Sequence, residues 1–256
     1  MLTAEVQPRY EAMSELMVRR DVGRVAHLIL NRPDKLNALS IALFEALDAH
    51  VSEIERDPVG AVVLRGAGRC FSAGHDLNDI AAGEAPPRPN YQSHVIERLA
   101  DLPMPVISAV HGHCYTGALE LALAGDIIVA AESARFADTH ARWALTPVWG
   151  LSQRLPRRVG TYRAREMMFT CRTYSGREAE TFGLANFTVP DAELEGAVDK
   201  LVREILTNSS FSHAANKRLL SATDGMALGA GLAHEIYHGE GRGPDMAERI
   251  AAWRAR

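Results

Sequence analysis

The sequence predicts an α/β fold followed by a helical region. Three short apolar runs, Val25–Leu30, Val62–Leu64 and Val106–Ile107, are typical of buried strands. Between the first two runs, the segment from Ser40 to Glu55 carries apolar side chains at helical spacing, so strands alternate with helices. From Ser152 onward, helical patterns predominate.

Caps and chain breakers set the bounds of the elements in the first half. Ser40 is a favourable N-cap for the helix that runs to Glu55, and Pro58 and Gly60 end this helix. Apolar residues between positions 95 and 102 share one helical face, and two prolines follow them. The repetition predicts stacked strand-strand-helix repeats.

Helices dominate the predicted second half. Ser175 and Glu178 have the spacing of a capping box, which marks a helix start. No stretch rich in glycine, serine or proline forces a domain boundary, so we expect a core over residues 1–190 and a C-terminal helical region over residues 191–256. The expected helices are Arg163–Phe169, Ser175–Phe182, Ala192–Leu206, Phe211–Ala222, Leu228–Tyr237 and Asp245–Trp253.

Composition and charge argue against several functions. The 256 residues are 47% apolar, which suffices for one large core. The net charge of −4 argues against a nucleic-acid partner, which requires a clustered basic surface. The chain has no apolar run of about eighteen residues, and Met1–Arg20 has no apolar signal core before a cleavage site. We therefore expect no membrane span, no secretory signal and a cytoplasmic location.

The cysteines and histidines indicate no bound metal. Cys70, Cys114 and Cys171 are odd in number and lack metal-ligand spacing, so we interpret them as reduced thiols. Cys114 lies in one of the glycine-bearing segments described below, and we disfavour a nucleophilic role for it. Without a His/Cys cluster or a complete dinucleotide fingerprint, neither a metal nor a redox cofactor is expected.

Two glycine-bearing segments indicate a site. Phe71–Leu77 and Gly112–Glu120 each follow an apolar, strand-like run. Their backbone N–H groups can converge on a carbonyl oxygen that becomes an oxyanion, where each donor contributes roughly 3–4 kcal/mol. Glu120 lies three residues after Gly117, on the same helical face. Taken singly, each segment is equally compatible with a tight turn that binds nothing.

Together with other segments, these turns closely resemble the crotonase superfamily, the enoyl-CoA hydratase/isomerase family. The resemblance covers nearly the whole chain and implies the ClpP/crotonase-like fold. The matching segments are Asn31–Leu39, Ala73–Asp76, Gly117–Ala122, Asp126–Ala130, Phe136, Gln153–Leu155, Ser175–Ala179 and Gly183–Ala185.

The resemblance implies an oxyanion hole made by the backbone N–H groups of His75 and Gly117. The side chain of His75 is then incidental to the hole, and we favour a place in the wall of the acyl pocket over a direct catalytic role. Gly117 is flanked by Thr116 and Ala118, where many family members have further glycines, so the backbone here is slightly less permissive.

The catalytic pair departs from the family pattern. Glu120 matches the first of the two glutamates that a hydratase of this family uses, whereas His140 occupies the position of the second. An imidazole, with an ordinary pKa near 6.5, can exchange protons at neutral pH. His140 is alternatively only a polar pocket residue. Asp138 can orient His140 or substitute for it, because alternation along an extended stretch places both on one side.

The resemblance also implies a coenzyme A site. Lys35, Leu36 and Ala38 match the segment near the nucleotide, although Lys35 is also compatible with a merely solvated surface. The other matching residues are Ala73, His75, Asp76 and Leu77, and Arg249 of the last helix is a candidate phosphate contact. The loop Ala81–Asn90 either gates substrate access or is a surface insertion without a role.

We therefore expect an acyl-CoA-processing enzyme, a lyase most similar to enoyl-CoA hydratases, which stabilises a thioester enolate. Coenzyme A enters as part of the substrate, and no other cofactor is expected. The alternatives are an enoyl-CoA isomerase or another non-hydratase crotonase, and a non-catalytic acyl-CoA-binding protein. The family also implies a homotrimer or a dimer of trimers, with residues 191–256 making oligomer contacts and closing the CoA pocket.

Overall fold

Two sheets organise the computed structural model, which describes residues 15–255. The main sheet has the order β1-β2-β3-β4-β6-β9, and a small sheet has the order β5-β7-β8. In the main sheet β1 pairs antiparallel with β2, and all later neighbours are parallel. The strands are β1 Met17–Val22, β2 Val25–Leu30, β3 Ala61–Gly66, β4 Val106–Val110, β5 His113–Tyr115, β6 Ile127–Ala131, β7 Arg135–Ala137, β8 Tyr174–Ser175 and β9 Phe187–Val189.

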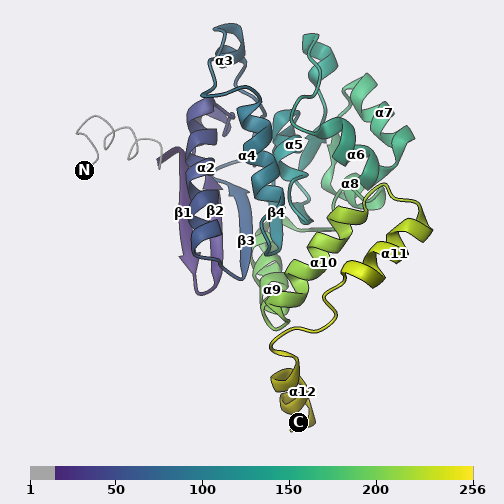
Figure 1. Cartoon of the computed structure of the whole chain (residues 1–256). Helices are drawn as coiled ribbons and strands as arrows, with labels where there is room; N and C mark the ends of the chain where they lie inside the picture. The colour runs from purple at the N-terminus through teal and green to yellow at the C-terminus, as the bar shows by residue number, and fades with distance from the viewer. Residues whose placement is uncertain (1–14, 256) are drawn as a thin grey trace.

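Helices cover both faces of the main sheet (Figure 1). Helices α2 (Ile41–Arg56) and α4 (Tyr91–Ala100) bury their apolar faces in the larger core cluster, with Phe44, Leu47 and Ile96 fully enclosed. On the opposite face, α9 (Leu194–Leu206) packs against Val63 and Val129 of the strands. Burial on both faces explains the continuous apolar runs of these parallel strands.

Further helices follow the sheets. The helix α3 lies at the top of Figure 1, and α10, α11 and α12 form the lower right part of the molecule. Their bounds are α3 Leu77–Ala81, α5 Gly117–Ala122, α6 Leu151–Val159, α7 Thr161–Thr170, α8 Gly176–Thr181, α10 Ser210–Thr223, α11 Leu228–His238 and α12 Met246–Arg254, with short 3-10 helices η1 Pro33–Lys35, η2 His140–Trp143 and η3 Asp191–Glu193.

Most elements predicted from the sequence are confirmed. Ser40 caps α2 by accepting from Leu43 N at 3.3 Å, and both bonds of the Ser175–Glu178 capping box form. The strand-strand-helix repeat is seen where β4 and β5 are followed by α5.

The prediction of a mainly helical second half omitted three elements. Strands β8 and β9 interrupt the helices, and α6 was not expected. Strand β9 has only three residues, which are too few to show a local pattern. It forms because it pairs with β6, which is distant in the sequence. Helix α6 contains Pro156, which normally argues against a helix interior.

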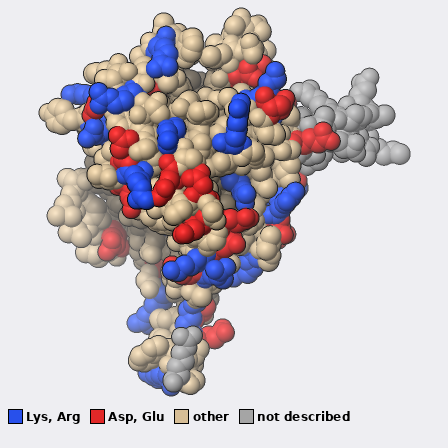
Figure 2. All heavy atoms as spheres, turned by 180° about the vertical axis from the view of Figure 1, so that it is seen from behind, with Lys and Arg blue, Asp and Glu red and all other residues tan. Residues whose placement is uncertain are grey.

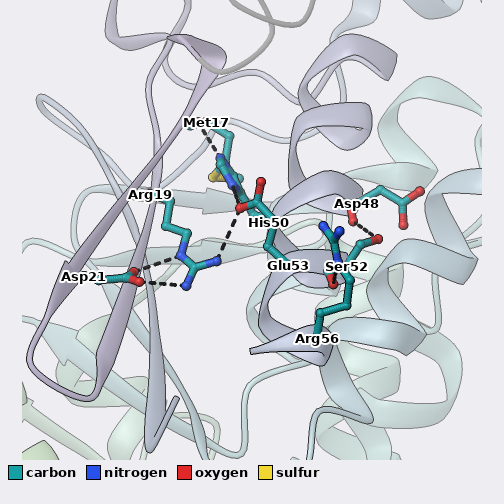
Figure 3. A network of polar contacts seen from close by, with 8 residues as sticks. All are labelled: Met17, Arg19, Asp21, Asp48, His50, Ser52, Glu53 and Arg56. Atoms are coloured by element: carbon teal, nitrogen blue, oxygen red, sulfur yellow. Dashed lines mark hydrogen bonds and ion pairs between the residues drawn. The ribbon is translucent and has the colours of Figure 1, made fainter. Parts of the chain in front are cut away.

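A polar network fastens the edge strand β1 to α2 (Figure 3). His50 of α2 lies with Nδ1 3.1 Å from Glu53 Oε2 and with Nε2 3.2 Å from the carbonyl oxygen of Met17. Arg19 of β1 donates to Asp21 at 2.7 Å and to Glu53 at 3.3 Å. The network therefore joins the strand to the helix through both backbone and charged groups.

The surface carries charges of both signs. Figure 2 shows Lys and Arg side chains intermingled with Asp and Glu over the rear face. Over residues 15–255, none of the helices combines the length and apolar character needed to cross a lipid bilayer. The predictions for the first fourteen residues, including the absence of a secretory signal, lie outside the described residues.

One buried amide holds the turn after β2 in place. The Asn37 side chain is fully buried, and its Nδ2 donates to the carbonyl oxygens of Ala67 and Cys70, both at 2.8 Å. Its Oδ1 accepts from Arg32 N at 2.8 Å. Asn37 also has a φ of +54°, a left-handed conformation that asparagine adopts more readily than most residues.

We expect Asn37→Ala to lower the free energy of unfolding by roughly 2–4 kcal/mol, because it removes hydrogen bonds to three backbone groups, one buried and two part-buried. Urea unfolding measures this change. The matched control is Asn208→Ala, which removes an exposed amide bonded to Glu204 O and should change stability by about 0.5 kcal/mol or less. Equal effects of the two substitutions would contradict the role given to Asn37.

Candidate active site

A cavity of about 420 Å³ opens where α3, α5, η2 and the segment before α6 meet. It brings together four of the residues singled out in the sequence, namely His75, Gly117, Glu120 and His140. The full lining is Ala73, His75, Leu77, Ile80, Gly83, Glu84, Thr116, Gly117, Glu120, Thr139, His140, Trp143, Leu145, Thr146, Val148 and Trp149.

Close backbone packing places two amides at one end of this cavity. A Cβ on Gly117 would lie 3.4 Å from His75 N and only 2.5 Å from Trp149 Cζ3, so no larger residue fits. Gly74 has a φ of +102°, and a Cβ there would lie 2.6 Å from Tyr115 O and 3.6 Å from Gly117 N. Within the described chain, neither His75 N nor Gly117 N donates to another group. Two adjacent N–H groups are thus free to bind an acceptor.

Hydrogen bonds around the two turns maintain this approach. Leu39 N donates to Gly74 O at 2.8 Å, and Asp76 N donates to Leu39 O at 3.0 Å. On the other side, Ser72 pairs with Cys114 in a parallel bridge. The segment that precedes α3 is therefore held between the turn after β2 and strand β5.

Thr116, directly before Gly117, adopts a strained backbone conformation. Its φ is +53° and its ψ is −111°, which a β-branched residue rarely adopts. The side chain compensates through its hydroxyl, which lies 2.6 Å from Thr139 Oγ1 and accepts from Thr139 N at 3.2 Å. Thr116 thereby joins the turn at Gly117 to the loop that carries His140.

Glu120 is buried, with 1% of its surface exposed, and its two carboxylate oxygens have different surroundings. Oε1 accepts from Trp149 N at 2.9 Å and from Leu151 N at 3.1 Å. Oε2 lies 3.8 Å from His140 Nε2. Burial raises the pKa of Glu120 above its ordinary value of 4.5, although the Leu151 amide, His140 and the Trp149 amide each act to lower it. The carboxyl group therefore holds a proton more readily than an exposed glutamate.

His140 is oriented by Asp138. The Asp138 Oδ1 atom lies 2.6 Å from His140 Nδ1 and accepts from His140 N at 3.1 Å. Both side chains are buried, with 8% of His140 and 1% of Asp138 exposed. The expected extended stretch is wrong, because β7 ends at Ala137 and His140 begins η2, but the two side chains do meet. Since Nδ1 faces Asp138, Nε2 is directed toward Glu120.

Only some of the residues expected near coenzyme A line the cavity. Ala73 and Leu77 line the cavity. Lys35 is exposed, Leu36 accepts from Ala73 N at 2.9 Å, and neither lines the cavity. Ala38, also outside the lining, accepts from Arg32 through its carbonyl oxygen.

Asp76 and Arg249 also lie outside the lining of the cavity. Asp76 caps α3 by accepting from Asn78 N at 3.1 Å, and it lies 3.3 Å from Arg32 Nη2. Arg249 lies on α12, at the opposite end of the molecule from α3 (Figure 1), and donates to Thr207 O at 2.9 Å. Within one chain, Arg249 therefore does not approach the cavity.

Sequence reasoning missed several residues of the site. Trp149 and Leu151 hold Glu120 through backbone amides, which no side-chain pattern reveals. Glu84 reaches the cavity from the loop after α3, where its position depends on a partner nine residues earlier, His75. The glycine at position 150, just before α6, was the available local sign that the chain turns here.

The three cysteines are free and buried, as expected for reduced thiols. Burial raises the pKa of the Cys114 thiol well above its ordinary value. Cys114 is therefore a poor nucleophile.

Comparisons with known proteins identify the family of the chain. Residues 21–238 match the family described as enoyl-CoA hydratase/isomerase. The 1,2-epoxyphenylacetyl-CoA isomerase of Escherichia coli (strain K12) is 31% identical over 254 residues, which cover 95% of this chain and 97% of that protein.

Two solved structures share the fold over nearly the whole chain. The enoyl-CoA hydratase of Bacillus anthracis has a TM-score of 0.86 at 33% identity, covering 94% of this chain and 96% of the other. A Thermobifida fusca structure in complex with CoA has a TM-score of 0.80 at 28% identity, covering 99% and 98%. The fold is therefore the crotonase fold, and the chain belongs to the enoyl-CoA hydratase/isomerase family.

Proposed function

We propose that this protein is a lyase of the enoyl-CoA hydratase type, in which Glu120 and His140 together act on water and substrate. The observation that carries the proposal is the 3.8 Å separation between Glu120 Oε2 and His140 Nε2, beside two free backbone amides in one cavity. A carboxylate and an imidazole at this distance can hold one water molecule between them.

The two amides supply the electrophilic part of the site. A thioester carbonyl oxygen placed between His75 N and Gly117 N would accept both N–H groups. As water adds to the β-carbon, the electrons of the double bond move toward this oxygen, and the enolate charge is stabilised there. Such preorganised donors are worth roughly 3–4 kcal/mol each in the transition state.

Glu120 is suited to the role of base. Its Oε1 is occupied by the amides of Trp149 and Leu151, so the orientation of the carboxylate is fixed and Oε2 remains for proton transfer. In the proposed step, Oε2 accepts a proton from water while the water oxygen bonds to the β-carbon. The raised pKa of Glu120 strengthens it as a proton acceptor.

His140 is suited to the role of acid. In the proposed site Asp138 accepts from Nδ1–H and orients the ring, so that Nε2 is left for proton transfer on the side of Glu120. In the proposed step, Nε2 gives its proton to the α-carbon of the enolate. Glu120 then returns its proton to His140, so the net change is the addition of one water molecule. The 3.8 Å gap is short enough for this return through a single water molecule.

The remaining parts of the proposal concern binding and assembly. We propose that Ala73 and Leu77 contact the pantetheine end of the substrate, and that Lys35 of this chain and Arg249 of a second copy contact the nucleotide. No cofactor besides coenzyme A is required. Exposed apolar side chains on α10, α11 and α12 support oligomer contacts by residues 191–256, namely Leu220, Leu228, Leu232, Ile236, Tyr237 and Trp253.

Incubation with a short enoyl-CoA in ¹⁸O-labelled water, followed by mass spectrometry, tests the function. A hydratase incorporates one labelled oxygen into a 3-hydroxyacyl-CoA product. Migration of the double bond without label would instead identify an enoyl-CoA isomerase. Binding without any conversion would favour an acyl-CoA-binding protein.

Glu120→Gln and His140→Ala should each lower kcat by roughly 10²–10⁴-fold, because each removes one proton-transfer group. Asp138→Asn should lower kcat less, since it removes the carboxylate that orients the imidazole while His140 itself remains. Steady-state kinetics over a range of pH measures these effects, with the exposed His94→Ala as control. A wild-type rate in His140→Ala would exclude the imidazole as the acid.

Glu120→Gln should also raise the free energy of unfolding at neutral pH. The folded-state pKa of Glu120 is raised, so the ionised carboxylate costs stability above that pKa. The gain should vanish as the pH falls through the raised pKa to below the ordinary value of 4.5, where the wild-type carboxyl is protonated in both states. Urea unfolding at several pH values measures this difference. A mutant less stable than wild type at neutral pH would show that the hydrogen bonds outweigh the burial.

A further inference from the structure

A second acid–imidazole pair lies in the same cavity. His75 Nε2 lies 2.8 Å from Glu84 Oε2, and both side chains are about one-fifth exposed. Gln92 of α4, which is buried, donates from Nε2 to Glu84 Oε1 at 3.2 Å. Both carboxylate oxygens are therefore held, and the loop after α3 is fixed against the cavity. The proposed hydration uses neither His75's side chain nor Glu84.

Aromatic packing fixes the orientation of the His75 ring. The imidazole lies 4.6 Å from the Trp149 ring at an interplanar angle of 37°. Trp149 is itself buried and packs edge-on against Phe44, with 5.0 Å between ring centroids. With Nε2 bound to Glu84, Nδ1 is the remaining polar atom of the ring, and it makes no hydrogen bond to another residue within 15–255. In the neutral ring that donates to Glu84, Nδ1 is an acceptor.

The cavity that His75 lines has an apolar part and a polar part, and the polar part is formed by Glu84, Thr116, Glu120, Thr139, His140 and Thr146. Leu77, Ile80, Leu145 and Val148 line the same cavity, together with Trp143. The backbone amide of His75 is one of the two free N–H groups, so its side chain begins next to the place proposed for the thioester. The ring nitrogen without a partner in residues 15–255, Nδ1, therefore belongs to a side chain that lines the cavity beside this place.

This arrangement distinguishes between acyl chains. A plain hydrocarbon chain would displace water from Nδ1 without replacing the lost hydrogen bond, and an unpaired buried acceptor is costly. A hydroxyl group at the matching position would donate to Nδ1 and avoid that cost. Sites built to hydrogen-bond a substrate hydroxyl reject analogues that lack it.

We propose that His75 Nδ1, oriented by Glu84 and Trp149, is a specificity determinant that selects acyl-CoA substrates with a hydroxyl group on the chain beyond the β-carbon. The inference rests on the proposed function for the placement of the thioester. It adds the chemical class of the acyl group.

Calorimetric titration provides a test that does not depend on turnover. The probes are saturated octanoyl-CoA and a series of its derivatives with a hydroxyl at successive carbons beyond the β-carbon. We expect the best hydroxylated probe to bind about tenfold more tightly than octanoyl-CoA, the size of one hydrogen bond to a group otherwise left unpaired. If octanoyl-CoA binds as tightly as every hydroxylated probe, the inference is wrong.

Variants test whether His75 and Glu84 cause the preference. His75→Phe keeps a ring against Trp149 and the backbone amide but removes Nδ1, so the ratio of the two affinities should fall to about one. Glu84→Gln should reduce the ratio partly, because the amide orients the imidazole less strongly. The matched control is Glu195→Gln, a carboxylate on α9 that pairs with Arg65 outside the cavity and should leave the ratio unchanged. An unchanged ratio in His75→Phe would overturn the proposal.

Turnover of the corresponding enoyl-CoAs separates the two conclusions. If unsubstituted and hydroxylated enoyl-CoAs are hydrated equally well and bind equally well, the hydratase proposal stands and the selectivity proposal fails. If no enoyl-CoA is converted but hydroxylated probes bind more tightly, the selectivity stands and the hydratase proposal fails.

Discussion

The site depends on the close approach of two backbone turns, at Gly74 and at Gly117. A methyl group at either position would overlap a neighbouring group, Tyr115 O in one case and the Trp149 ring in the other. Absence of side chains at these two positions lets two N–H groups lie side by side and unpaired. The sheets hold the turns in place, because each turn follows a strand and pairs with the neighbouring segment. Everything else in the cavity is arranged around these two amides.

The two titratable groups, Glu120 and His140, are oriented by hydrogen bonds from neighbouring segments. Glu120 is held by two amides from the segment that leads into α6, and His140 is held by Asp138. Each group thus presents one defined atom to the other. A histidine stands where the family resemblance implies a second glutamate, and the Asp138 carboxylate lies 2.6 Å from its Nδ1. The site is in this sense a paired-carboxylate site with an imidazole between the carboxylates.

Local patterns account for what the sequence predicted well. The caps at Ser40 and Ser175 and the two glycine segments act within a few residues, so they could be read directly. Contacts between segments that are distant in the sequence could not be predicted from such local patterns. The pairing of β9 with β6, and the amides of Trp149 and Leu151 that bind Glu120, join residues far apart in the sequence through backbone groups that every residue type possesses. The contact between Asp138 and His140 was anticipated, but from an extended geometry that the chain does not adopt.

Glu120 Oε1 accepts two hydrogen bonds, from Trp149 N and Leu151 N, and these link the charge of Glu120 to the wall of the cavity. A neutral carboxyl is a weaker acceptor than a carboxylate, so a proton on Glu120 loosens both amides. The Trp149 ring packs against Gly117 and His75. Because the Trp149 amide binds a protonated Glu120 more weakly, this part of the cavity wall is then held less firmly. Amide hydrogen exchange at these two positions would then report the charge of the Glu120 carboxyl.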